Sequence, residues 1–198
     1  LGCARHYANT LFNIMRGGVF KDGYKVDSPD LLAFVKNANA EIAARHAAFF
    51  RRLPKTVRYE SMVAGASALG DPQLERICRE YLPLTFSRRH GDPSRPWNKF
   101  SITTRNADGK RSLNYEGNRR DIFQNWEALA LSFPGYTAGM ICRFLNASTA
   151  DGYNPYRITR NGIDWEVVDA HDPWSYIGYW GDHQIIYLLK LLEQLERH

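Results

Sequence analysis

Several familiar signatures are missing from this sequence of 198 residues. No apolar run approaches the ~20 residues that a membrane-spanning helix requires, so we expect no membrane partner. The three cysteines, Cys3, Cys78 and Cys142, lie far apart and form neither a Cys-x-x-Cys pair nor a cluster with histidine. We therefore expect no metal site, and instead free, buried thiols in a reducing, cytoplasmic compartment.

Motifs of several common enzyme classes are absent as well. The sequence holds no glycine-rich phosphate loop, no Gly-x-Ser-x-Gly and no His-Glu-x-x-His. The net charge is +5 and the pI about 9.2, but the basic residues are spread along the chain and form no known module, so no nucleic-acid partner is expected. An initiator Met and a signal-peptide pattern are both lacking, and the sequence begins in a helix-like pattern. We expect the chain to be a fragment of a longer polypeptide.

Aromatic residues are abundant, at 13% of the sequence with five Trp and eleven Tyr, and many lie in polar, turn-rich segments. With 44% hydrophobic residues, the chain can bury a core, and we interpret residues 1–198 as one domain or part of one. Two segments, residues 83–120 and 149–178, are rich in turn-forming residues. Because loops of this length in compact domains are usually functional, we expect both to be active-site loops.

The rest of the sequence is typical of a mainly α protein made of helical hairpins. Ser28 is expected to cap a long helix with Pro29 at its first position and Pro54 at its end. Gly70 closes the next helix, and Asp71 starts another. Apolar spacing and helix-start signals together predict helices over residues 3–16, 29–53, 56–70, 72–82, 121–133, 137–148 and 183–197.

Polar and aromatic residues gather where each long loop enters a helix. The first cluster, "YEGNRRDIFQNWEA", contains Asp121 and Gln124, whose spacing matches a capping box. A second interpretation is that Arg119, Asp121 and their neighbours line a sugar pocket with Trp126 as its floor, since sugars bind to charged and amide groups beside an aromatic face. Trp126 also lies on the apolar stripe of its predicted helix, which favours core packing.

The second cluster, "DAHDPWSYIGYWGDH", ends at Asp182 and His183. Asp182 directly precedes an apolar helical run, so it could be an N-terminal helix residue. It could instead be a general acid, because an aromatic wall that includes Trp180 and a nearby carboxylate would raise its pKa. Residues of this cluster and its flanks are candidates for an anion site, a proton relay or a second carboxylate: His171, His183, Glu166 and Asp172, together with Arg119 of the first cluster.

At the level of motifs, "GNRRDIFQNWEAL" followed by "YWGDHQIIYLLKLLE" resembles the cellobiose-phosphorylase family and related glycoside hydrolases. The upstream segment "RPWNKF" is similar to an aromatic-Asn segment of that family, in which Trp97 is the aromatic residue. The resemblance implies an (α/α)6 barrel, here incomplete. It covers roughly residues 95–192, about half of the chain.

The resemblance also implies roles for individual residues. Arg120 and Asp121 would bind sugar hydroxyls, Gln124 matches the glutamine of the motif, and Trp180 would lie beside Asp182 as the general acid. Trp97 and Trp126 are further candidates for binding the sugar. The implied function is inverting cleavage of a glycosidic bond in a disaccharide or oligosaccharide, by phosphorolysis or by hydrolysis. No cofactor is implied, although a phosphorylase would use inorganic phosphate as its second substrate. The alternative is a non-catalytic carbohydrate-binding or structural helical domain.

Overall fold

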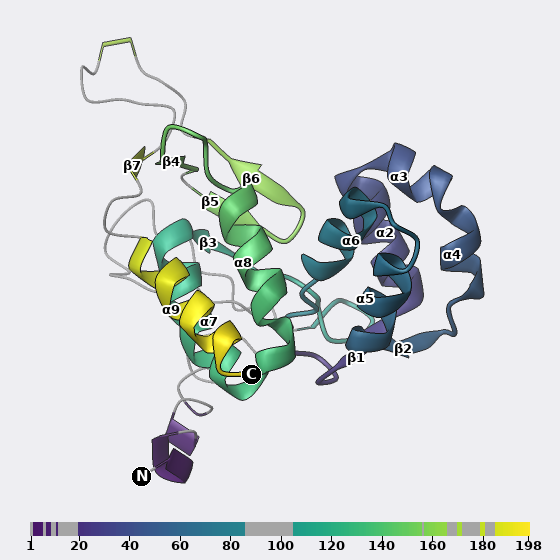
Figure 1. Cartoon of the computed structure of the whole chain (residues 1–198), viewed down its shortest axis with the longest axis horizontal. Helices are drawn as coiled ribbons and strands as arrows, with labels where there is room; N and C mark the ends of the chain where they lie inside the picture. Colours follow the sequence, from purple (N-terminus) through teal and green to yellow (C-terminus); the bar gives the residue numbers. More distant parts are fainter. Residues whose placement is uncertain are drawn as a thin grey trace.

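The computed structural model describes residues 2–5, 7–8, 11, 20–85, 105–155, 157–165, 170–171, 179–180 and 185–198, with the backbone alone at residues 116, 118, 120, 121, 179 and 180. The described parts are mainly helical, with three small antiparallel sheets (Figure 1). The (α/α)6 barrel remains an expectation. None of the helices in these parts is both long enough and apolar enough to cross a membrane.

Residues 20–85 form a first region of short helices and one two-stranded sheet. Its elements are β1 (Lys25–Asp27), α2 (Ser28–Ala38), α3 (Ala40–Arg45), α4 (Ala47–Arg52), β2 (Thr56–Arg58), α5 (Tyr59–Ser67) and α6 (Pro72–Arg79). Strands β1 and β2 pair with Val26 opposite Val57. As a result, the segment predicted as one helix from residue 56 begins with a strand, and its helix starts only at Tyr59.

Side-chain caps set three helix starts of this region, those of α2, α3 and α6, whereas α4 and α5 start without one. The prediction that Ser28 caps the first long helix is wrong, because Asp27 accepts the hydrogen bond from the Asp30 amide at 3.0 Å. The Ser28 hydroxyl lies in the first turn and donates to the Pro54 carbonyl at 2.6 Å. The prediction for Asp71 is confirmed, since its carboxylate accepts hydrogen bonds from two amides at the start of α6.

The predicted long helix over residues 29–53 is three helices, with interruptions at Asn39 and His46. Asn39 has an extended backbone, and its side chain accepts a hydrogen bond from the Ile42 amide, which caps α3. An asparagine side chain competes with the helical backbone for such donors, so it ends one helix and starts the next. The apolar spacing continues across the interruption, which explains why periodicity alone missed it.

Residues 105–198 form a second region, described with gaps. Its elements are β3 (Glu116–Asn118), α7 (Arg119–Ser132), the short 3-10 helix η1 (Pro134–Tyr136), α8 (Thr137–Asn146), β4 (Tyr153–Asn154), β5 (Arg157–Thr159), β6 (Gly162–Asp164), β7 (Tyr179–Trp180) and α9 (Ile185–Glu196). The predicted apolar stripe of α7 is confirmed, with Ile122, Trp126 and Leu129 buried. Helix α7 begins at Arg119, directly after the β3–β5 pairing, and therefore two residues before the predicted start at Asp121. The predicted loop over 149–178 contains three short strands.

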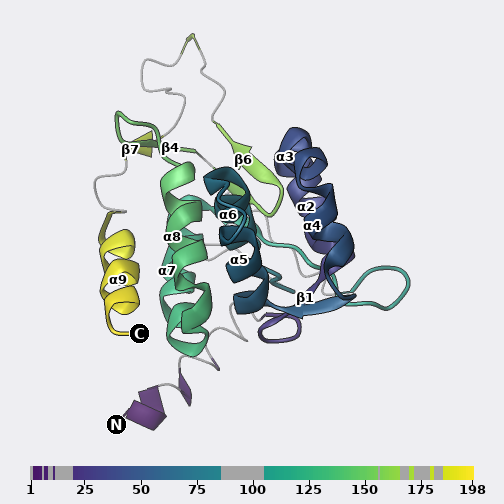
Figure 2. The same ribbon diagram turned by 45° about the vertical axis from the view of Figure 1, so that its right-hand side comes forward.

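Helices α7 and α9 run side by side in the same direction, and α8 packs against both (Figures 1 and 2). Glu127 of α7 accepts hydrogen bonds from Lys190 at 2.9 Å and, through its carbonyl, from Gln194 at 3.4 Å. Because the two helices are parallel, their N-terminal ends lie at the same end of the helical layer. The β4–β7 pair lies at that end as well (Figure 1).

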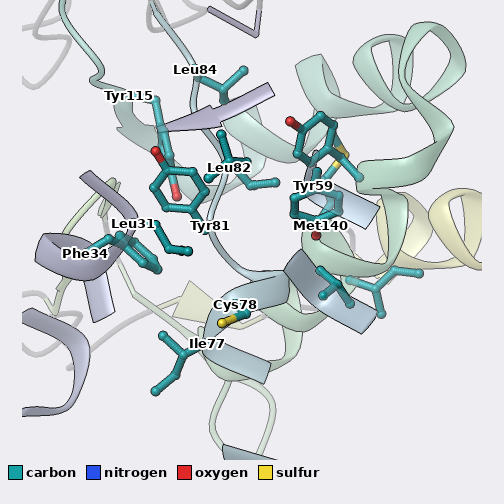
Figure 3. Packing of buried hydrophobic residues seen from close by; sticks show 14 of the residues in the cluster. Leu31, Phe34, Tyr59, Ile77, Cys78, Tyr81, Leu82, Leu84, Tyr115 and Met140 are labelled. Carbon is teal, nitrogen blue, oxygen red and sulfur yellow. The ribbon is translucent and has the colours of Figure 1, made fainter. Parts of the chain in front are cut away.

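The two regions share one hydrophobic core. Figure 3 shows Leu31 and Tyr81 of the first region in the same cluster as Tyr115 and Met140 of the second. Helix α8 approaches the first region so closely at Gly139 that an added Cβ would lie 2.0 Å from the Arg79 carbonyl oxygen. This contact requires glycine and brings the backbones of α6 and α8 together.

Buried and partly buried ion pairs add to this junction. Glu80 is almost fully buried and pairs with Arg76 at 2.6 Å and with Arg143 of α8 at 3.3 Å. Asp30 pairs with Arg160 at 2.5 Å, across the same boundary. Since removal of Arg143 would leave the buried Glu80 carboxylate with fewer partners, the Glu80–Arg143 pair helps to fix how the two regions meet.

The three cysteines are free thiols in different environments. Cys78 is buried, as predicted, and burial raises the pKa of its thiol to about 12. Cys142 is half-buried, and Cys3 is exposed, so the prediction of a buried thiol is wrong for Cys3. A thiol with the pKa of Cys78 stays protonated at neutral pH and is therefore a poor nucleophile.

Candidate functional site

Arg119 is the first residue of α7, and its side chain points into the protein, where it is only 1% exposed. Its guanidinium donates to the Phe144 carbonyl at 3.1 Å and to the Ser148 hydroxyl at 2.5 Å. The same group lies 3.8 Å from the centre of the Phe144 ring, a cation–π distance. Burial lowers the pKa of Arg119 to about 9. Since this value is still above neutral pH, the guanidinium stays charged there.

Asn154 links this arginine to the β4–β7 pair. Arg119 donates through Nη1 to the side-chain oxygen of Asn154, which is 2% exposed. In the sheet, Asn154 is paired with Tyr179, and Tyr153 is paired with Trp180. The first turn of α7 is therefore connected, through one side-chain contact and one strand pairing, to the strand that comes just before Asp182 in the sequence.

This arrangement brings the backbones of the two predicted clusters together. Arg120 and Asp121 follow Arg119 in the first turn of α7, so Asp121 is the third helical residue and not the cap that the sequence predicted. Gln124 follows one turn later with an exposed side chain. Residues Asp182 and His183 lie outside the described residues, and α9 begins at Ile185.

Trp126 belongs to the core. Its side chain is 2% exposed and makes edge-to-face contacts with Tyr115 at 5.4 Å and Phe123 at 5.1 Å between ring centres. The interpretation of Trp126 as a packing residue is confirmed, and its faces are covered by protein. Trp97 lies outside the described residues, and Trp180 is described through its backbone in β7.

The residues predicted for an anion site or a second carboxylate are placed only in part. His171 is exposed, whereas Glu166, Asp172 and His183 lie outside the described residues. The anion-binding role of Arg119 stays a prediction, and its contacts with interior groups favour a positioning role. Within the described parts of the chain, His, Cys, Asp and Glu side chains form no group of three that could hold a metal ion.

Sequence reasoning missed Asn154, Ser148 and Phe144, which hold the Arg119 side chain. One local signal was available, because Pro155 follows Asn154 and a residue before proline is biased toward extended backbone. That signal predicts a strand at Asn154. It does not identify the arginine 35 residues earlier as its partner.

A second candidate site is a cavity of about 390 Å³ in the first region, among α2, α3 and α4. Its lining is largely apolar and includes Leu32, Ala43 and Phe50. Two exposed cations, Lys36 and Arg51, also line it. The cavity suits an apolar group attached to an acidic one, and its lining contains none of the residues of the two motif clusters.

Comparison with known families gives one similarity, which lies in the first region. Residues 20–83 match the family model of glycoside hydrolase family 149 insertion domain 1. A search of curated proteins gave no match. The family match covers less than half of the chain, and it supports a relation to glycoside hydrolases in general without selecting the cellobiose phosphorylases.

Proposed function

We propose that this chain is part of the catalytic domain of a carbohydrate-active enzyme that cleaves a glycosidic bond with inversion, with Asp182 as the general acid. One observation carries the proposal. A region that matches a glycoside hydrolase insertion domain shares its core with helices α7 and α9, and the Arg-Asp-x-x-Gln and Trp-x-Asp motifs occur at the entrances of these helices. The remainder of a longer polypeptide would complete the domain.

In the proposed reaction, the Asp182 carboxyl group gives its proton to the glycosidic oxygen as the bond from that oxygen to the anomeric carbon breaks. An oxygen of inorganic phosphate or of water attacks the anomeric carbon from the opposite face, which inverts its configuration. Phosphate would yield a sugar 1-phosphate and a shortened sugar. Water would yield two free sugars and needs a second carboxylate as its base.

Substrate binding is assigned to the first turn of α7 and the strand before Asp182. Arg120 and Asp121 are proposed to hold sugar hydroxyl groups, because charged groups at this position can make paired hydrogen bonds. Gln124 adds an amide one turn further along and is exposed, as a binding residue must be. Trp97 and Trp180 are proposed as aromatic faces for the sugar rings.

A non-catalytic carbohydrate-binding or structural domain is the second candidate. A carboxylate in the first turn of a helix is favoured by the helix dipole, which suffices to explain Asp121. Asp182 comes three residues before Ile185, the first residue of α9, and on this alternative it is only a polar residue that precedes the helix. On this alternative, neither aspartate takes part in a reaction.

The experiment that separates the candidates is product analysis on the longest natural polypeptide that contains residues 1–198. It is incubated with disaccharides and short glucans, with and without inorganic phosphate. The Asp182→Asn variant is the test, and Asp151→Asn, a change at an exposed turn residue, is the matched control.

Sugar 1-phosphate formed only with phosphate identifies a phosphorylase, and free sugar formed without phosphate identifies a hydrolase. In either case we expect Asp182→Asn to be inactive and Asp151→Asn to be active. Absence of product from every sugar, in a folded protein, would contradict the proposal and favour the non-catalytic domain.

A further inference from the structure

We propose that Arg119 and Asn154 are positioning residues, which hold the strand before Asp182 against the helix turn that carries Arg120 and Asp121. This inference rests on the proposed function for its meaning, since it concerns the same site. The contact itself can be tested without any activity. Neither residue is proposed to touch the substrate.

Arg119 is suited to this role because three elements meet at its guanidinium. The group belongs to the first turn of α7 and donates to the carbonyl of Phe144 in the last turn of α8. A cation at the C-terminal end of a helix is favourably placed in the helix dipole. The Ser148 hydroxyl, just beyond α8, accepts a second hydrogen bond. These contacts fix the guanidinium and leave its Nη1 directed at Asn154.

Asn154 connects the guanidinium of Arg119 to the strand that precedes the second motif. Its side-chain oxygen accepts from Arg119, while its backbone is paired with Tyr179 in the two-residue ladder of β4 and β7. Such a short strand pair is only marginally stable by itself. A charge-assisted hydrogen bond from a buried arginine is stronger than a neutral one and therefore supports the pairing.

Few residues separate the Arg119–Asn154 contact and the paired strand β7 from the residues with proposed roles in sugar binding and catalysis. Asp121 comes two residues after Arg119, and Asp182 comes two residues after Trp180. Under the proposed function, a displacement of β7 would therefore shift the acid relative to the sugar-binding turn. Misplacement of reacting groups by about 1 Å can lower a rate by about 100-fold.

Arg143 provides the matched control. It is also a largely buried arginine in α8, but its Nη2 donates to the Thr159 and Gly162 carbonyls at 2.7 and 3.3 Å, and its Nη1 pairs with Glu80. It therefore ties α8 to β5, β6 and the first region, and in the described parts of the chain it donates no hydrogen bond to β4 or β7. Arg143→Met removes a similar buried cation without touching the proposed contact.

The first readout is amide hydrogen exchange in the 198-residue chain, with the amides of α2 as internal reference. We expect Arg119→Met and Asn154→Ala to speed exchange at residues 153–154 and 179–180 by about tenfold relative to α2. Arg119→Lys keeps a charge and should restore part of the protection. Arg143→Met should speed exchange at β5 and β6 and, measured relative to α2, leave exchange at residues 179–180 near its wild-type level.

Unchanged exchange at residues 179–180 in folded Arg119→Met would overturn the inference. Equal acceleration there in Arg119→Met and Arg143→Met would also overturn it, because the effect would then be general destabilisation. Neither result depends on turnover, so failure of the proposed function and failure of the contact remain distinguishable.

The second readout is kinetic and uses the polypeptide and sugar identified by product analysis. Arg119→Met is expected to lower kcat by about 100-fold while KM changes by less than about threefold, since the acid is misplaced and the sugar-binding side chains are retained. Arg119→Lys should recover part of kcat. A rise in KM with unchanged kcat would contradict a positioning role and indicate that Arg119 binds substrate.

Discussion

Several helix starts in the two regions of this chain are held by different kinds of contact. In the first region, Asp27, Asn39 and Asp71 cap three helices through hydrogen bonds that span two or three residues. In the second region, η1 and α8 start without a side-chain cap, and the entrance of α7 is built on Arg119. The partners of Arg119 lie 25 to 35 residues away. The starts of α2, α3 and α6 in the first region thus depend on local hydrogen bonds, whereas the entrance of α7 in the second region depends on contacts with residues far along the chain.

The largest expected effect comes from separating the two regions at their buried ion pair. Arg143→Met removes the cation that pairs with Glu80 and leaves a buried carboxylate with fewer partners. We expect a loss of about 3 kcal/mol in the free energy of unfolding, measured with urea. Arg58→Met is the control, since the Arg58–Glu60 pair is exposed, and it should change stability by less than about 0.5 kcal/mol. If both variants lost similarly little stability, the Glu80–Arg143 pair would not be what holds the two regions together.

A steric change at the same junction should have the next largest effect. Gly139→Ala places a Cβ against the Arg79 carbonyl, so α6 and α8 must move apart. We expect a loss of about 2 kcal/mol in urea unfolding. Gly162→Ala is the control, because an added Cβ there meets no atom within 4 Å. If Gly139→Ala were as stable as Gly162→Ala, the result would contradict the close contact between α6 and α8 at Gly139.

The smallest expected effect lies inside the first region and depends on pH. The hydrogen bond with His46, together with those from the Gln73 and Leu74 amides and from Arg45, lowers the pKa of Asp71 from 3.8 to about 2. A lowered carboxyl pKa means that the carboxylate stabilises the folded state above the unfolded-state pKa, and that this stability is lost as the pH falls through the folded-state pKa.

Asp71→Asn keeps a capping side chain but removes the charge. We expect wild type to be more stable than the variant at about pH 5, and the difference to shrink steadily toward about pH 2. Urea unfolding at several pH values measures it. A difference that stays constant over this range would show that the carboxylate of Asp71 contributes nothing through its charge.

The same contrast explains what could be predicted from the sequence. The Asp71-Pro72 helix start and the apolar stripe with Trp126 were predicted because each depends on residues a few positions apart. The interruption at Asn39 was missed, since apolar spacing continues through it. The inward position of the Arg119 side chain was not predicted, because a pattern of charges does not tell whether an arginine side chain points outward or into the protein. Its partners, Phe144, Ser148 and Asn154, become neighbours only after folding.

The central claim is that Asp182 supplies a proton to the departing sugar. It is tested most directly by comparing Asp182→Asn with wild type on two substrates, the natural sugar and a glycoside whose leaving group is a weakly basic phenol. A weakly basic leaving group departs without protonation, so it does not need the acid. We predict that Asp182→Asn loses about 100- to 10,000-fold in kcat on the natural sugar and keeps most of its rate on the activated glycoside. Equal losses on both substrates, or no loss on either, would contradict the assignment of Asp182 as the general acid.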